Sequence, residues 1–286
     1  MKKYIVLVLT MFFLMGFSMS ASATYFEAGD AGSQAAADVV LDIVFVADTS
    51  GSMYDELTAI SNAVYDIVAN IDCPECDAWV RARFMNINGS SYGYFNESVT
   101  SYVYGAGGTP ISNHQEDNGP AVTDLSNWYN WNDDTTAEQD YYRAIVTIGD
   151  EGTENGYDDH WPMGIYQDDW DAAFVANQAA IANDVMVFSL VGTNSSFDPG
   201  DDIEVLFETM AVGGTGGIST IYSFGNTGGS YALTTSETLE DDIEYIICTA
   251  AGGGTGGEPV PEPATMILLG SGLIGLAGLK KRIRKN

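Results

Sequence analysis

The sequence predicts an α/β fold in which helices flank a doubly wound, mostly parallel β-sheet. Two observations predict it. Short apolar runs that are typical of buried strands alternate along the chain with segments whose apolar residues recur at helical spacing. The first run, residues 40–47, is apolar almost throughout, as expected for a strand that is covered on both faces. Alternation of this kind indicates βαβ units, which place successive strands parallel in one sheet.

The expected elements follow in order. After strand 40–47, residues 57–71 carry apolar side chains at helical spacing and predict a helix. Residues 79–87 alternate as a strand does, and residues 98–104 are expected to form an edge strand beside it. Further strands are expected at 144–148, 185–191 and 230–233, and further helices at 170–182, 203–212 and 239–247. The stretch 109–142 shows no clean amphipathic helix.

The N-terminal end differs in composition from this domain. Residues 1–23 combine two lysines, an apolar run and Ala21-Ser22-Ala23, which is typical of a cleaved secretory signal peptide. Residues 24–38 are small and polar and predict a loose leader. A single domain is expected at 39–250, followed by a glycine-rich, flexible linker at 251–259.

The C-terminal end, residues 260–286, has three ordered parts. Pro261, Glu262 and Pro263 come first, an apolar run at 264–279 predicts a short membrane segment, and five basic residues close the chain. The basic cluster predicts a cytoplasmic end, with the domain outside. These three parts resemble the PEP-CTERM sorting signal of bacteria. The resemblance implies recognition by an exosortase after signal peptidase has acted, a transient stay in the membrane, and delivery to the cell surface or the extracellular matrix.

The charge of the chain excludes one class of partner. The 286 residues carry 10 basic and 40 acidic side chains, a net charge of −30, and the segment 24–263 holds three arginines as its basic side chains. A surface this acidic repels phosphate groups, which argues against nucleic-acid binding.

Polar residues follow the predicted central strands. Asp48, Ser50 and Ser52 come directly after the first strand, and Asp150 follows strand 144–148. Thr109 lies in a glycine loop after the expected edge strand. Ligands of such sheets bind at the carboxyl ends of the strands, and carboxylate and hydroxyl oxygens suit hard divalent cations. The alternative for the first group is an Asp/Ser cap on the helix that follows.

In order and spacing, these five residues resemble the metal-ion-dependent adhesion site (MIDAS) of von Willebrand factor type A domains. The resemblance implies a divalent cation, Mg²⁺ in the first place and Mn²⁺ or Ca²⁺ as alternatives, held by Asp48, Ser50, Ser52, Thr109 and Asp150. It implies that a partner protein binds through its own carboxylate. Two departures from the family pattern stand out. Glu151 follows Asp150 and could compete for the metal, and the irregular stretch after Thr109 leaves the position of that residue open.

The three cysteines predict a disulfide, since the chain is expected to be exported. Cys73 and Cys76 end a predicted helix instead of opening one, unlike a thioredoxin-type redox pair. In the fold that the resemblance implies, the first and last helices end on the same side of the sheet. We therefore expect Cys73 or Cys76 to pair with Cys248, with Cys73–Cys76 as the alternative.

The sequence therefore predicts an exported, metal-dependent adhesion module and no enzyme. Its two histidines, His114 and His160, lie in no zinc motif, and its glycine-rich strings lack the lysine of a phosphate loop. Aromatic stretches at 128–131 and 157–170 either stack on the sugar rings of a matrix polysaccharide or on a protein ligand, or pack on their own loops. The first alternative is a structural matrix protein that binds no metal. The second, which the sequence favours less, is a hydrolytic or redox enzyme.

Overall fold

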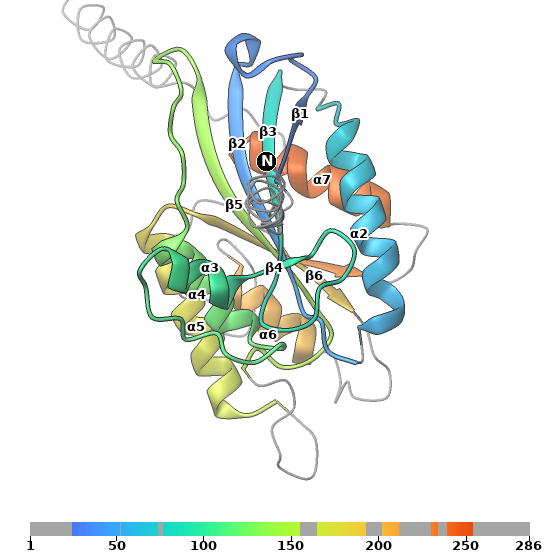
Figure 1. Ribbon diagram of the computed structural model, residues 1–286, viewed down its shortest axis with the longest axis vertical. Coiled ribbons are helices and arrows are strands. Elements are labelled where there is room, and N and C mark those ends of the chain that lie inside the picture. The colour runs from blue at the N-terminus through green and yellow to red at the C-terminus, as the bar shows by residue number, and fades with distance from the viewer. Residues whose placement is uncertain are drawn as a thin grey trace, which may run out of the picture.

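A computed structural model describes residues 25–51, 53–73, 77–154, 165–192, 202–211, 230–233 and 239–253, and it has the expected α/β architecture (Figure 1). The described strands are β1 (Tyr25–Gly29), β2 (Val39–Ala47), β3 (Ala78–Asn86), β4 (Glu97–Ser98), β5 (Asp140–Gly149), β6 (Met186–Gly192) and β7 (Ser230–Leu233). The described helices are η1 (Gln34–Ala36), α2 (Tyr54–Ala69), α3 (Val99–Gly105), α4 (Asn118–Trp128), α5 (Gln167–Ala182), α6 (Asp202–Met210) and α7 (Leu239–Ala251).

The strands form one sheet in the order β1-β3-β2-β5-β6-β7, and β4 also pairs with β3. Every pairing among the described strands is parallel except that of β1 with β3. The prediction of a mostly parallel sheet is confirmed. In strand β2, Val39, Leu41, Ile43 and Phe45 face one core, whereas Val44 and Val46 face the other. The whole strand is buried, which explains why its sequence is apolar without alternation.

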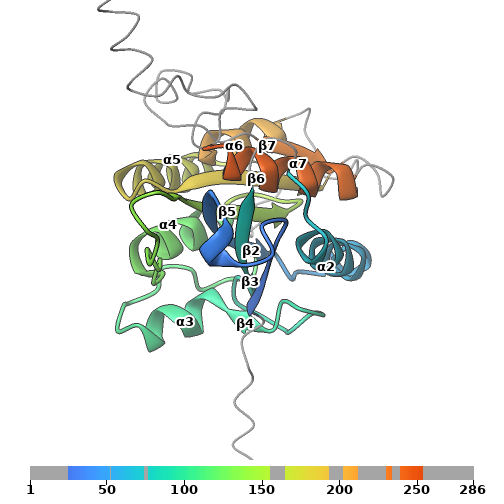
Figure 2. The same cartoon turned by 90° about the horizontal axis from the view of Figure 1, so that it is seen from above.

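Helices cover both faces of the sheet, as Figure 2 shows when the molecule is seen from above. Helices α2 and α7 lie on one face and contribute Leu57, Ile60 and Ile246 to its core. Helices α3, α4, α5 and α6 pack on the other face. Two separate cores therefore hold the central strands in place.

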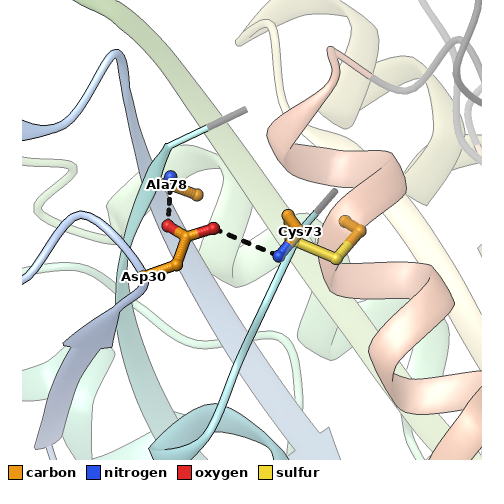
Figure 3. Close-up of a disulfide and its surroundings, with 4 residues drawn as sticks. Asp30, Cys73 and Ala78 are labelled. Carbon is orange, nitrogen blue, oxygen red and sulfur yellow. Dashed lines mark hydrogen bonds between the residues drawn. A yellow bond between two sulfur atoms is a disulfide. The ribbon is translucent and has the colours of Figure 1, made fainter. Parts of the chain in front are cut away.

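The leader differs from the expectation. Residues 25–29 are not loose but form β1, which runs antiparallel along β3. Its end is fastened by Asp30, whose carboxylate accepts hydrogen bonds from the backbone N–H groups of Cys73 (3.1 Å) and Ala78 (2.6 Å), as Figure 3 shows. The added strand covers an edge of β3 that would otherwise expose unpaired backbone groups.

The prediction of an edge strand at 98–104 is wrong for all but the first residue of that range. Strand β4 ends at Ser98, and α3 begins at the next residue. Ser98 is extended, and its hydroxyl accepts a hydrogen bond from the backbone N–H of Ser101 (3.1 Å), which caps the helix. Val99 and Val103 are both fully buried, and their spacing of four residues fits one face of a helix.

The disulfide joins Cys73, beyond the end of α2, to Cys248 in α7, with a Cα–Cα distance of 5.3 Å (Figure 3). The expected pairing of a cysteine near the end of α2 with Cys248 is confirmed, and it is Cys73 that makes the bond. Cys76 lies outside the described residues. Because 175 residues separate the two partners, the bond fastens the last helix to the first part of the domain.

The aromatic stretch at 128–131 packs largely on its own neighbours. The ring centroid of Tyr129 lies 5.3 Å from that of Tyr102 and 4.5 Å from that of Trp131. Burial raises the pKa of Tyr129 to about 12, and the charge of Arg83 opposes the rise. Trp128 remains 42% exposed. Most of the second aromatic stretch, 157–170, lies outside the described residues.

Several predicted segments lie partly or wholly outside the described residues: the signal peptide 1–23, most of the linker 251–259 and the sorting signal 260–286 with its apolar run 264–279. Among the helices that the structure does describe, none has the length and apolar character needed to cross a membrane.

Candidate metal centre

The central strands bring two of the predicted ligands to one edge of the sheet. Ala47, the last residue of β2, is in register with Ile148 near the end of β5. The backbone N–H of Asp48 donates to the carbonyl oxygen of Ile148 (2.8 Å), which continues the pairing by one residue. Asp48 and Asp150 therefore follow the ends of two adjacent strands and lie side by side. The negative charges of their carboxylates repel each other.

The carboxylate of Asp48 is fully buried and incompletely paired. Its Oδ1 accepts a hydrogen bond from the backbone N–H of Ser50 (2.6 Å). Its Oδ2 is buried and accepts no hydrogen bond from any residue in the described part of the chain. A buried carboxylate oxygen without a partner carries a large desolvation cost, and buried charges in proteins are normally paired or bound to metals. Oδ2 of Asp48 is therefore available to coordinate a metal ion.

The electrostatics of the cluster favour a cation. Burial raises the pKa of Asp48 well above its ordinary value, and the negative charges of Glu116 and Asp150 raise it further, although hydrogen bonding to Ser50 opposes the rise. The neighbouring Asp150 and Glu151 are 5% and 6% exposed. Several carboxylates thus share a poorly solvated edge, where a divalent cation would offset their repulsion.

A carboxylate that the sequence did not single out, Glu116, joins this cluster. The loop that carries it lies directly before α4, and Gly149 allows the start of that helix to approach the end of β5. A Cβ atom at Gly149 would lie 2.7 Å from Nδ2 of Asn118. The side chain of Glu116 is 12% exposed and interacts with Ser50 and Glu151. Burial and the charges of Asp150 and Asp117 raise the pKa of Glu116 to about 6.

Thr109 is placed elsewhere. It is exposed and follows Gly108, where a Cβ atom would lie 2.6 Å from the ring of Trp128 at the far end of α4. The chain then runs back along α4, because Asp124 accepts hydrogen bonds from the backbone N–H groups of Ile111 (3.0 Å) and Ser112 (2.9 Å). The loop before α4 thus separates the threonine from the start of that helix, and Glu116, close to the helix start, is the residue of this loop whose charge acts on Asp48.

Of the two predicted serine ligands, Ser50 lies in the cluster. Ser50 is 3% exposed, and its side chain hydrogen-bonds to the carboxyls of Asp48 and Glu116. Ser52 lies outside the described residues. Within the described residues, no group of three or more histidine, cysteine, aspartate or glutamate side chains has the arrangement of a metal site by itself. A metal here would therefore depend on hydroxyl or water oxygens as well as on carboxylates.

The raised pKa of Glu116 predicts how the stability of the metal-free chain depends on pH. Well below pH 4.5, the ordinary pKa of the group, the Glu116 carboxyl is protonated in the folded and unfolded states alike and has no effect on stability. As the pH rises to about 6, the unfolded state ionises first, so the folded state loses stability. Because solvent screens this partly buried group, the loss should be about 1 kcal/mol, and Asp48 contributes with the same sign.

The measurement is urea unfolding of the metal-free chain and of its Glu116→Gln variant at pH 4.5 and 7. We expect the stability of the variant relative to the parent chain to increase by about 1 kcal/mol between these two pH values. If the stability difference between the variant and the parent chain is the same at both pH values, the pKa of Glu116 is not raised in the folded protein.

Comparisons with known proteins give the following. The PEP-CTERM protein-sorting motif matches residues 259–282, which confirms the sorting signal predicted from the sequence. No curated protein matches the chain. Among solved structures, proximal thread matrix protein 1 from the mussel byssus is similar, with 13% identity, a TM-score of 0.38, and coverage of 79% of this chain and 48% of that one.

Two further structures of the same mussel protein are also similar. A second crystal form has 12% identity and a TM-score of 0.34, and a form with a zinc-occupied MIDAS motif has 12% identity and a TM-score of 0.35. Each match covers 78% of this chain and 48% of the other, so the chain spans about half the length of the mussel protein.

Proposed function

We propose that this protein is an exported adhesion or matrix module that binds an acidic group of a partner through a divalent metal at the carboxyl end of its sheet. The single observation that carries the proposal is the fully buried Oδ2 of Asp48, which accepts no hydrogen bond from the described residues. The sorting motif at 259–282 indicates export and membrane anchoring before an exosortase acts.

The residues fit a hard cation. Asp48 and Asp150 would supply carboxylate oxygens, Ser50 would supply a hydroxyl, and Ser52 joins them by the resemblance to the MIDAS pattern. Oxygen donors of this kind favour Mg²⁺, with Mn²⁺ and Ca²⁺ as alternatives. The bound cation would supply positive charge that attracts the carboxylate of a partner protein. The protein's own part is to hold the donors in a poorly solvated cluster and to keep them oriented on two adjacent strands.

A second candidate function rests on one exposed aromatic side chain. Trp128 is 42% exposed at the end of α4, where it could stack on a sugar ring of a matrix polysaccharide. This contact would not need a metal. It lies at the opposite end of α4 from Glu116, so the two modes of binding would be separable by mutation. No catalytic activity is proposed.

The test is retention of the purified exported chain on an envelope and matrix fraction of the producing cells, in Mg²⁺ and after chelation. The proposal predicts retention in Mg²⁺ and its loss on chelation, with recovery when Mg²⁺ or Mn²⁺ is restored. Retention that chelation leaves unchanged would point to the metal-independent alternative. A Trp128→Ala variant measured in parallel identifies polysaccharide stacking, because its loss of retention would not depend on the metal.

A further inference from the structure

We propose that the exposed surface where α3 meets α4 is a binding site for an uncharged polysaccharide, whose sugar rings stack on Trp128 and Tyr104. The inference rests on the second candidate function above, names its class of ligand, and does not involve the metal. The exposed side chains of Tyr104, Thr109, Ile111 and Trp128 are called the α3–α4 patch. The patch contains the glycine loop around Thr109, which lies apart from the candidate metal centre.

The loop after α3 supports the indole of Trp128 from one side. A Cβ atom at Gly108 would lie 2.6 Å from Cδ2 and 2.8 Å from Cε2 of Trp128. Both rings of the indole share these two atoms, so the glycine can approach them only across a face of the ring system. Trp128 nevertheless remains 42% exposed. The indole is therefore held against the loop with further surface open to a ligand, and a larger residue at position 108 would displace it.

The same loop brings two more apolar side chains to this surface. Gly107 has a φ of 85°, a left-handed conformation that favours glycine, and its N–H donates to the carbonyl oxygen of Tyr104 (3.1 Å). Tyr104 is 64% exposed at the end of α3, which contacts α4 on this face of the sheet (Figure 2). Ile111 is 49% exposed, and its N–H donates to Asp124, one helical turn before Trp128. Three large apolar side chains thus border one loop.

The charge around the patch favours an uncharged ligand. The segment 24–263 carries 40 acidic side chains against three arginines. Residues 98–131, which the structure describes throughout, hold three carboxylates and no lysine or arginine. Asp117 and Asp124 are 1% and 2% exposed, and the side chain of Glu116 is 12% exposed. The rest of the domain would repel an anionic polymer, and a basic polymer would bind the many acidic side chains elsewhere in preference to this patch.

The side chains of the patch suit a sugar better than a protein. A pyranose ring has an apolar face of C–H groups, which stacks on an aromatic ring, and a rim of hydroxyl groups, which form hydrogen bonds. Trp128 and Tyr104 supply the rings, and the exposed Ser101, Thr109 and Asn127 supply hydroxyl and amide groups beside them. A stable protein interface takes about 20 to 30 residues from each partner. The patch is smaller than this, but it is large enough for a few sugar rings.

The test is affinity electrophoresis of the exported chain, with its disulfide intact, in native gels that contain a chelator. Hydroxyethyl cellulose, dextran and galactomannan are the uncharged probes, and carboxymethyl cellulose is an anionic probe with the same backbone as the first. We expect an uncharged polysaccharide to retard the parent chain and carboxymethyl cellulose not to retard it. Trp128→Ala should weaken binding by about 10-fold or more. Gly108→Ala should weaken it similarly, because the added methyl group displaces the indole.

Two further variants sharpen the experiment. Tyr104→Ala changes a side chain that is 64% exposed, so it should keep the fold and weaken binding. Tyr245→Ala is the matched control, because Tyr245 is 50% exposed in α7, on the opposite face of the sheet. The control should be retarded as the parent chain is. If Trp128→Ala does not fold, Tyr104→Ala decides the question by itself.

The inference is overturned if no uncharged polysaccharide retards the parent chain, if carboxymethyl cellulose retards it equally, or if the folded patch variants bind as the parent does. Loss of retention of Trp128→Ala on the envelope and matrix fraction, without binding of the parent to any polysaccharide, would mean that the patch docks a protein, and this also overturns it. None of these results bears on the metal-dependent function, because the gels contain a chelator. Failure of that function shows instead as retention that chelation leaves unchanged.

Discussion

Replacing Asp48 by Asn is expected to abolish divalent-metal binding and at the same time to stabilise the metal-free chain at neutral pH. Asn lacks the negative charge, so metal affinity should fall by more than about 100-fold, since loss of an outer hydrogen-bond partner alone costs about 10- to 100-fold. The stability should rise because a neutral amide replaces a carboxyl whose ionised form is disfavoured by burial and by Glu116. The amide oxygen can still accept the hydrogen bond from Ser50.

Thermal unfolding with and without Mg²⁺, together with Mn²⁺ titration, measures both effects. The parent chain should gain stability from the metal, whereas Asp48→Asn should start higher and gain nothing. Asp140→Asn, a change of the same kind at the exposed first residue of β5, is the control and should respond to metal as the parent does. A variant that is less stable than the metal-free parent would mean that Asp48 is a structural residue. Undiminished metal binding would place the site elsewhere.

Replacing Cys248 by Ser is expected to destabilise the folded protein by about 3 to 5 kcal/mol. The disulfide closes a chain segment of 175 residues, and long closed segments restrict the unfolded state most strongly in the chain-entropy account. Helix α7 would then depend on its apolar contacts alone, among them those of Ile243, Ile246 and Ile247 with the core beside α2. Urea unfolding of the oxidised parent and of the variant gives the difference directly.

The other cysteines provide the controls for this experiment. Cys73→Ser should cost as much as Cys248→Ser, and the double variant should cost no more than either, because a single bond is lost in all three. Cys76→Ser should leave the stability of the domain unchanged. Equal losses in the Cys76 and Cys248 variants, with none in the Cys73 variant, would show that the other cysteine makes the bond in solution.

Several parts of the fold could be predicted from residue patterns alone. The continuous apolar run of β2 reports burial on both faces, and helical spacing of apolar residues reports one buried face of α2. The sequence does not predict strand β1, because a short strand at a sheet edge buries little and leaves a weak pattern. The sequence of helix α3 predicts a strand, because a helix of two turns is too short to show helical periodicity clearly. Val99 and Val103 fit one face of either element, and the cap at Ser98 decided between them.

The candidate site was predictable where its residues follow strands. The proximity of Asp48 and Asp150 could be predicted from the sequence, because adjacent parallel strands end at the same edge of the sheet. Thr109 and Glu116 could not be placed in this way. Both belong to a long connection whose course is set by hydrogen bonds from its backbone to the side chains of Asp117 and Asp124. Only the folded loop shows that the glutamate faces the cluster and the threonine is exposed.

The class of fold, the sorting motif at the C-terminal end and the positions of the two strand-end aspartates follow from the sequence alone, because each is encoded in local periodicity or in a short linear motif. The tertiary structure decided which cysteine bonds to Cys248, which loop residue approaches Asp48, and that Oδ2 of Asp48 is left without a hydrogen-bond partner among the described residues. These are properties of groups that meet across long stretches of chain. Their distances depend on how helices pack on the sheet, which no local pattern records.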